Sequence, residues 1–557
     1  MVVCAASAGL LGGVGGCHTL STQPRSLHVP AESEAASELA DPTDTFVYRE
    51  QVKKLLRSAM AGGPVDGASG LLLDTPQGPV RAQLRLHGMS WSPEDVNRLF
   101  EFQWRPTTHL QRRHSREGIG LPLVAVRWRS EDEPRYLRMQ PFAVTALLRP
   151  SEPGEEAGGP YTLDLYNPLV LTDIPWRGQS APLAADLSAP LEYWSLAHDQ
   201  QSMRVAGFFH PEEARVQPRL GFVEPYEPGK IPLVFVHGLA SDAATWLDML
   251  NDLRAEPEFC RRYQVWAFRY PTGRGFLESA AELRERLQAA REECDPEHRD
   301  PALDHLILVG HSMGGLLSKL QIVSSEQRLW QAMGAGPFES LRAPQHVRDQ
   351  LSRLLFFEPT PSVRRVVFIG TPHHGASLAA RPVARLASKA VSFTGEDSGQ
   401  YTQLLVDNYE RLHPWLWMGH PTSVDMLIPD NPVLDAMNQL RVAEGVELHS
   451  IIGTQGLLLP GNSDGVVQTG SARHPGVQSE VYVRASHSGL LQEPTTVAEL
   501  LRILEEHAAQ LPPTAPAPSR ELQRFESTIP PSREELPTPR GERSTQRGTT
   551  PGRTTGH

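Results

Sequence analysis

The stretch HLILVGHSMGGLL, residues 305–317, decides the fold of this 557-residue chain. Residues 306–309 have the length and composition of a fully buried strand, and the residues after the glycines can form a helix. Between strand and helix lies GHSMG, a G-x-S-x-G pattern whose central residue is Ser312. A sharp turn here strains the serine backbone and requires neighbours without a Cβ. It also holds the hydroxyl above the carboxyl end of a sheet, near a helix N-terminus. The pattern predicts a nucleophilic serine, with an ordinary strand–helix turn as the alternative.

Composition limits the possible partners. The net charge of −12, the pI near 6.0 and the scattered basic residues give no electrostatic footprint for nucleic acid. The four cysteines, Cys4, Cys17, Cys260 and Cys294, fit neither a zinc site nor a dense disulfide framework. Cys260 and Cys294 could pair in an oxidising compartment, but two idle thiols are the favoured interpretation. We expect no metal and no organic cofactor, and no apolar run after residue 16 is long enough for a membrane-spanning helix.

The first 17 residues are apolar and small, and they end in Val14-Gly15-Gly16-Cys17. This pattern resembles a bacterial lipoprotein signal, which implies lipidation at Cys17. No Lys or Arg precedes Arg25, so the positively charged leader is missing, and either the true start lies upstream or the segment is not a signal. We expect an exported protein anchored to the membrane of the cell envelope; the alternative is a cytoplasmic protein with an apolar N-terminus. Residues 18–42 are predicted to be a polar linker.

Residues 43–215 predict a mixed, strand-leaning accessory domain of unknown role. A helix is expected over residues 45–61, and the β-rich runs lie at residues 121–128, 142–148 and 161–166. A polar cluster near Gly118 and Gly120 comprises His109, Arg112, Arg113 and His114. We interpret this cluster as a solvated loop rather than a ligand site.

Residues 216–510 predict a second domain in which strands alternate with helices, as in βαβ units with a mostly parallel sheet. Besides the strand before Ser312, strands are expected at residues 231–238, 263–268, 366–370, 447–453 and 479–483, and helices at 276–293 and 495–510. Residues 511–557 are rich in Pro, Thr, Arg and Gly and predict a disordered tail.

Two helical insertions, residues 325–361 and 377–438, exceed what this sheet needs and are expected to form a cap over the site. Five large apolar residues in them either line an acyl pocket or form the cap's own core: Trp330, Phe338, Trp415, Trp417 and Met418. The second interpretation is slightly favoured.

A serine nucleophile needs a base and an orienting carboxylate, and in this class of fold they follow the serine in the order acid, then histidine. Asp464 lies in a glycine-flanked turn after a predicted strand, and His487 lies in the loop after the last predicted strand. Both loops leave the same rim of the sheet as Ser312. A turn aspartate and a surface histidine are the alternatives. The competing bases His474 and His449 lie less well, in a loop and inside a strand.

An oxyanion hole needs two backbone donors. One is expected to be the amide of Met313, which follows the nucleophile, and the other the amide of Leu239, in the loop after the strand ending His237-Gly238. The residues expected to support the elbow and this loop are His237, Gly238, Gly310, His311 and Gly314.

The segments VFVHGL, GHSMGG, IGTPHHG, SDGVV and Ser-His-Ser-Gly together resemble the α/β-hydrolase superfamily. They most resemble its lipase and esterase branch, which includes bacterial triacylglycerol lipases and glycosylphosphatidylinositol-inositol deacylase-like proteins. The resemblance covers residues 232–510 and implies Ser312 as nucleophile, Asp464 as acid and His487 as base. Ala376 and Ser377 follow Gly375, a minor departure from the family pattern.

The resemblance implies a serine-dependent carboxylic-ester hydrolase that forms an acyl-enzyme from a lipidic or hydrophobic ester. One alternative is an acyltransferase that passes the same acyl group to an alcohol or lipid acceptor. Another is a surface-anchored binding or scaffold protein without catalysis, which a complete set of three triad residue types disfavours. The sequence leaves the oligomeric state open.

Overall fold

The computed structural model describes residues 39–61, 65, 67, 69–106, 110–129, 133, 139–151, 159–197, 218–241, 243–376, 395–418, 421–455 and 462–511. The predicted lipoprotein signal with Cys17, most of the predicted linker and the predicted tail from residue 512 lie outside these residues. Export and lipid anchoring therefore stay predictions. Within the described part, no helix is both long and apolar enough to cross a membrane.

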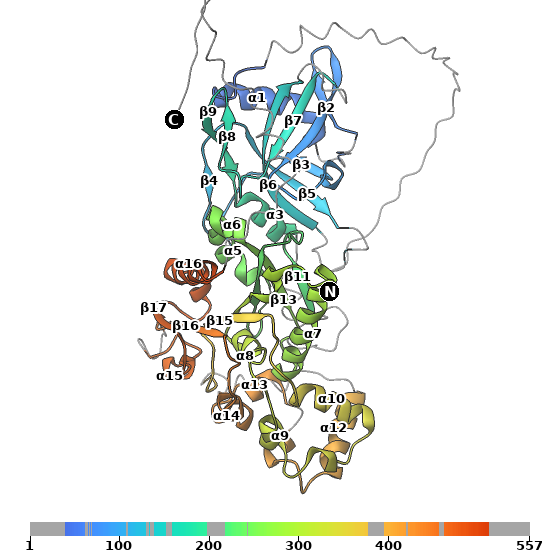
Figure 1. Cartoon of the computed structure of the whole chain (residues 1–557), viewed down its shortest axis with the longest axis vertical. Helices are drawn as coiled ribbons and strands as arrows, with labels where there is room; N and C mark the ends of the chain where they lie inside the picture. Colours follow the sequence, from blue (N-terminus) through green and yellow to red (C-terminus); the bar gives the residue numbers. More distant parts are fainter. Residues whose placement is uncertain are drawn as a thin grey trace, which may run out of the picture.

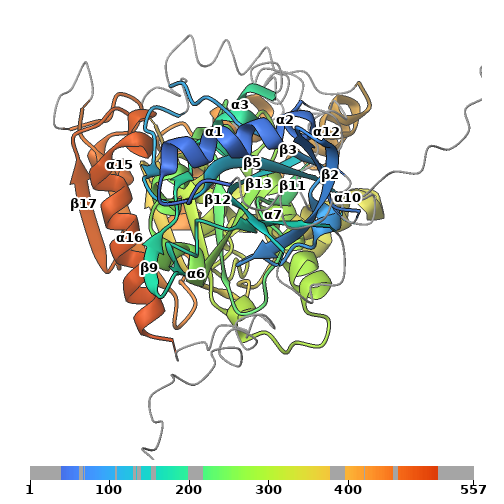
Figure 2. The ribbon, with the colours of Figure 1, turned by 90° about the horizontal axis from the view of Figure 1, so that it is seen from above.

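The N-terminal domain is built on a six-stranded sheet with the order β1-β2-β7-β6-β5-β3 (Figure 1). The sheet comprises β1 (Leu71–Thr75), β2 (Gly78–His87), β3 (Arg98–Phe100), β5 (Leu121–Trp128), β6 (Met139–Pro150) and β7 (Tyr161–Tyr166). The other elements are α1 (Thr45–Leu55), α2 (Arg57–Met60), η2 (Pro93–Asp95), α3 (Ala189–Ala197) and two small ladders, β4 (Ser115–Arg116) with β10 (Ala185–Asp186) and β8 (Asp173–Trp176) with β9 (Gln179–Pro182). Seen from above, α1 lies across this sheet (Figure 2), and its Tyr48 and Val52 are fully buried in the domain core. The predicted strand-leaning character of this N-terminal region is confirmed.

The C-terminal domain is built on a seven-stranded sheet with the order β11-β13-β12-β14-β15-β16-β17. The strands are β11 (Arg219–Phe222), β12 (Ile231–Val236), β13 (Tyr263–Arg269), β14 (Leu306–His311), β15 (Val363–Ile369), β16 (Glu447–Gly453) and β17 (Ser479–Val483). Only β11 at one edge is antiparallel to its neighbour. The mostly parallel sheet and the strand–helix alternation are therefore confirmed, and β14, which precedes Ser312, is the central strand of the sheet.

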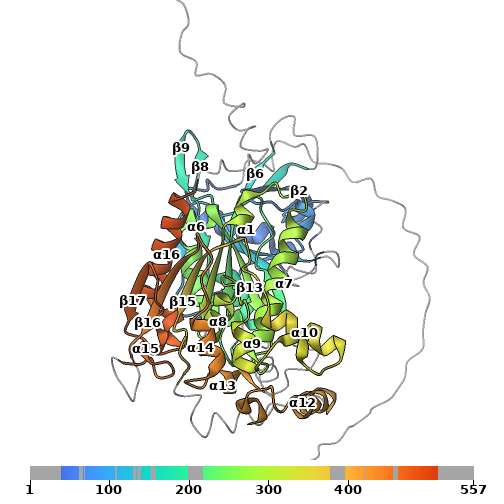
Figure 3. The same ribbon diagram turned by 60° about the horizontal axis from the view of Figure 1, so that its bottom comes forward.

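Helices cover both faces of this sheet, which explains why its central strands read as continuous apolar runs. Successive residues of β14 enter opposite cores: Leu306 and Leu308 pack with the core of α7 (Phe276–Cys294) and α8 (Met313–Lys319), and Ile307 and Val309 with that of α5, α6 and α16. The second face comprises η4 (Ala243–Trp246), α5 (Leu247–Arg254), α6 (Pro257–Arg262) and α16 (Pro494–Ala509), with the short turns η5 (Pro301–Asp304) and η8 (Gly489–Gln492). Figure 3 shows α16 beside the strands β15 to β17.

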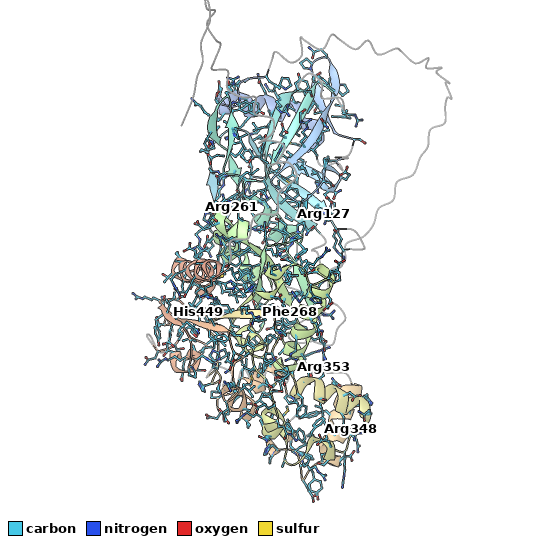
Figure 4. All side chains as sticks on the ribbon, in the orientation of Figure 1. Arg127, Arg261, Phe268, Arg348, Arg353 and His449 are labelled. Carbon is cyan, nitrogen blue, oxygen red and sulfur yellow. The ribbon has the colours of Figure 1, made fainter. Side chains whose placement is uncertain are left out.

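The two predicted insertions pack into one helical subdomain, which we call the cap. It comprises α9 (Arg328–Met333), η6 (Phe338–Ser340), α10 (Gln345–Leu355), α12 (Gly395–Asp407) and η7 (Pro414–Met418), followed by α13 (Ser423–Met426) and α14 (Pro432–Asn438). The insertions are joined by a bridge between Gly334 and Leu412. Arg353 of α10 pairs with Glu282 and Glu285 of α7, at the junction of cap and sheet domain (Figure 4).

The loop around Arg112 and His114 is only partly solvated, because the two side chains are 34% and 30% exposed. Both side chains contact Asp252 of α5, with His114 Nε2 at 2.7 Å from Asp252 Oδ1. The loop lies at the junction of the two domains, where these two polar residues also find a partner on the other domain. Arg113 is half exposed and pairs with Asp186 of its own domain; His109 lies outside the described residues.

No disulfide joins Cys260 and Cys294 in the structure. Cys260 is buried, and this burial raises the pKa of its thiol to about 12. Cys4 and Cys17 lie outside the described residues.

Candidate active site

Ser312 occupies a strained turn between β14 and α8. Its φ of 54° and ψ of −127° are unusual for a residue with a Cβ, as the elbow pattern predicts. The glycines on either side have a steric role: a Cβ on Gly310 would lie 2.5 Å from the Cα of Gly315, and one on Gly314 would lie 2.1 Å from the carbonyl oxygen of Val236. The strand and helix can therefore meet this closely only because both positions lack a side chain.

Asp464 and His487 form a hydrogen-bonded pair although they come from different loops. The Nδ1 of His487 lies 2.7 Å from Asp464 Oδ2, and the backbone amide of His487 donates to the carbonyl of Asp464 at 2.9 Å. The other carboxylate oxygen accepts hydrogen bonds from the amides of Val466 and Val467, at 2.9 and 2.7 Å. Burial raises the pKa of Asp464, but the bonds from His487 and the two amides outweigh this effect and lower it overall. The carboxylate is thus held ionised and in a fixed orientation.

His311 connects the serine to this pair. Its ring lies 4.7 Å from the ring of His487, centroid to centroid, and its Nε2 lies 3.0 Å from the carbonyl oxygen of His487. Because a carbonyl only accepts, Nε2 carries the proton. Burial lowers the pKa of His311 to about 3, so the ring is neutral. His311, which precedes Ser312, thereby holds the backbone of the loop that bears His487.

Gly238 packs directly against Ser312: a Cβ there would lie 2.9 Å from the Cβ of Ser312. The preceding His237 is buried, stacks on Tyr270 at 4.4 Å, and accepts a 2.6 Å hydrogen bond from the Tyr270 hydroxyl through its carbonyl. Together they fix the loop after β12 beside the elbow.

The backbone amides of the same loop differ in whether they have a hydrogen-bond partner. Ala240 has a φ of 51°, and its amide donates to the Thr272 hydroxyl at 3.1 Å. In contrast, neither the amide of Leu239 nor that of Met313 donates a hydrogen bond to another described residue. The assignment of these two amides as oxyanion donors therefore stays a prediction.

Ser312 as a whole residue is 7% exposed. Its hydroxyl forms no hydrogen bond with another described residue. Hydrogen bonds of this kind are often long or unformed in free enzymes and tighten when substrate binds. The structure thus joins Asp464 to His487, places the His311 ring beside that of His487, and places Gly238 against Ser312.

The competing histidines are engaged elsewhere or deeply buried. His449 lies in β16 with Nδ1 2.8 Å from the hydroxyl of Ser479, and burial lowers its pKa to about 4. His474 is buried beside Phe368, which also lowers its pKa to about 4. Neither contacts Asp464, so His487 remains the better candidate base.

A buried polar cluster lies at the other end of α8. Burial lowers the pKa of Lys319 to about 7, and its Nζ donates to Asn438 Oδ1 at 2.7 Å. The side-chain Nδ2 of Asn438 in turn donates to the carbonyl of His373, in the Thr-Pro-His-His-Gly segment after β15. This segment is also held by Ser471, whose hydroxyl donates to the carbonyl of Gly375. Sequence reasoning missed these contacts because their partners are far apart along the chain.

The aromatic residues of the cap divide between its core and a cavity. Trp330 is 2% exposed and packs edge-on against Phe338 at 5.2 Å, which supports the core interpretation for both residues. Trp417 is 45% exposed, and the side chain of Met418 lies outside the described part. A cavity of about 180 Å³ is lined by Trp415, Pro421, Asp425, Ile428, Pro429, Asp430, Asn431 and Pro432.

Comparison with known proteins agrees with this architecture. Residues 233–500 match the model of the alpha/beta hydrolase family. This match and the observed topology show that this part of the chain has the α/β-hydrolase fold. A search of curated proteins finds no match.

Similar solved structures include a lipase of Bacillus licheniformis in its mature form, with 18% identity over 51% of this chain and 97% of that chain and a TM-score of 0.31. A lipase-esterase related protein of Clostridium acetobutylicum has 11% identity over 52% of this chain and 99% of that chain, with a TM-score of 0.29. An esterase of Pyrococcus furiosus has 12% identity over 51% and 82%, with a TM-score of 0.28. Likeness at this level leaves the activity of this chain to be argued from its own residues.

Proposed function

We propose that the C-terminal domain is a serine-dependent carboxylic-ester hydrolase that acts through an acyl-enzyme. The observation that carries the proposal is the pair of Asp464 and His487 beside the strained elbow of Ser312. A buried carboxylate on Nδ1 of a histidine leaves its Nε2 free to accept a proton. The three groups have the residue types, the chain order and the positions at the ends of strands that this chemistry uses.

In the proposed reaction, Ser312 Oγ attacks the ester carbonyl carbon while its proton passes to Nε2 of His487. Asp464 keeps the other ring proton on Nδ1 and stabilises the imidazolium that forms. The carbonyl oxygen becomes an oxyanion, which accepts hydrogen bonds from the free amides of Leu239 and Met313, each worth about 3 kcal/mol.

The tetrahedral intermediate then collapses. The bond to the alcohol oxygen breaks, His487 returns its proton to that oxygen, and the acyl group remains on Ser312. A water molecule attacks the acyl-enzyme by the same route: His487 takes its proton, the acid leaves, and the serine hydroxyl is restored.

We further propose that the acyl group is apolar. The cavity of the cap supports this part of the proposal through its apolar wall of Trp415, Ile428 and three prolines, which a hydrocarbon chain could contact; Asp425, Asp430 and Asn431 form the rest of its lining.

Hydrolysis of p-nitrophenyl esters of rising acyl length tests both parts. We expect turnover by the wild-type chain, increasing kcat/KM with acyl length, and none by Ser312→Ala. A wild-type chain that is folded but inactive on the whole series would contradict the proposal. Addition of alcohol acceptors distinguishes hydrolysis from acyl transfer, because a transferase would yield a new ester instead of free acid.

A further inference from the structure

The N-terminal domain reaches into the C-terminal domain through the segment between β3 and β4. Leu110 is fully buried in the core of the C-terminal domain to which α5 and α16 contribute. The amide of Gln111 donates to Asp248 Oδ1 of α5 at 2.7 Å. Figure 1 shows α3, α5 and α6 between the two sheets. This segment of the N-terminal domain therefore packs on the second face of the C-terminal domain, against α5.

Arg112 joins two elements of the C-terminal domain at this junction. Its Nε donates to Asp252 Oδ1 at 3.0 Å and its Nη2 also pairs with the Asp252 carboxylate. Its Nη1 donates to the carbonyl of Gln492 at 2.7 Å. The backbone carbonyl of Arg112 accepts from Asn251 at 2.9 Å. A single planar guanidinium thus ties α5 to η8, and both ends of the residue are held.

The turn η8 directly follows His487 in the chain. Its Leu490 is fully buried, and a Cβ on Gly370 would lie 3.0 Å from Leu490 Cδ1 and 3.3 Å from His487 Nδ1. A Cβ on Gly453 would likewise meet Leu490 at 3.1 Å and the Cβ of Asp464 at 2.7 Å. Leu490 and the Asp464–His487 pair therefore pack against the same two glycines, so a shift of η8 displaces this pair.

We propose that Arg112 is a positioning residue for His487, and that the N-terminal domain serves as a clamp on the turn that carries the general base. This inference rests on the proposed hydrolase function. Loss of the clamp leaves substrate binding intact but misplaces the base, and a misplacement of about 1 Å costs on the order of 100-fold in rate.

The test compares Arg112→Ala with Arg113→Ala in the full chain. Arg113 is a matched control because it is the adjacent arginine and also pairs with an aspartate, but Asp186 belongs to its own domain. For Arg112→Ala we expect kcat on a p-nitrophenyl ester to fall about 10- to 100-fold with KM within about twofold. For Arg113→Ala we expect both constants to stay near wild type. Arg112→Lys keeps a cation opposite Asp252 and should recover part of kcat.

Hydrogen–deuterium exchange of peptides covering residues 486–493 provides a readout that does not need activity. Exchange should rise in Arg112→Ala and stay unchanged in Arg113→Ala, with both variants melting cooperatively. Equal kcat values for the two variants, or unchanged exchange at η8 in Arg112→Ala, would overturn the proposal. If the wild-type chain hydrolyses no ester, the proposed function fails, and the exchange measurement alone decides whether the clamp exists.

Discussion

Replacing Asp464 by asparagine tests how the carboxylate acts on His487. An asparagine side chain has nearly the same volume, and its Oδ1 can still accept the amides of Val466 and Val467. Its NH2 group then faces His487 Nδ1, which must accept instead of donate. The ring proton moves to Nε2, the atom that has to take the serine proton. We expect kcat to fall about 10⁴-fold, the size of effect known for this change in a serine protease triad, or about 5 kcal/mol in the barrier.

The chain contains a closely matched control in the N-terminal domain. Asp164 pairs with His87 at 2.7 Å, and in both pairs the aspartate side chain is 2% and the histidine side chain 14% exposed. Asp164→Asn should therefore lower the free energy of unfolding, measured in urea, but leave kcat for p-nitrophenyl ester hydrolysis near wild type. Comparable kcat values for Asp464→Asn and wild type, or an equal loss in Asp164→Asn, would refute the assigned role.

Three further predictions concern the structure around the site. Because burial lowers the pKa of Lys319 to about 7 in the folded chain, the unfolded state binds more protons between about pH 7 and 10. Over this range the free energy of unfolding in urea should rise by about 1.4 kcal/mol per pH unit more for wild type than for Lys319→Met, and parallel curves for the two would contradict the lowered pKa. Gly453→Ala places a Cβ 2.7 Å from that of Asp464, so kcat should fall while KM changes little, and an unchanged kcat would show that the loops yield freely. Ser312→Gly should be more stable in urea than Ser312→Ala by about 1 kcal/mol, because glycine relieves the positive φ; equal stabilities would mean that the turn holds no strain.

Much of the C-terminal domain could be predicted from local sequence patterns. The apolar runs at β12, β14 and β15 are buried on both faces, so their composition alone indicates central strands. The glycines of the elbow indicate a tight turn because no other residue fits. By contrast, the edge strand β11, of only four residues, was missed because it is too short for a recognisable pattern.

Contacts between distant segments could not be predicted in this way. Arg112 and His114 read as loop residues because nothing local reveals that Asp252 lies opposite them. The Thr272 hydroxyl, which accepts a hydrogen bond from the Ala240 amide, gives no signal in the sequence either. Long-range hydrogen bonds depend on how elements dock, and a single sequence does not report docking.

The central claim, that Ser312 is a nucleophile activated by His487, is tested most directly by a fluorophosphonate reagent and mass spectrometry of the intact chain. We expect one covalent adduct on the folded wild-type chain, mapped by peptide analysis to Ser312, much slower labelling of His487→Ala, and none of Ser312→Ala. A folded wild-type chain that stays unlabelled, or that carries the adduct on another residue, would contradict the claim.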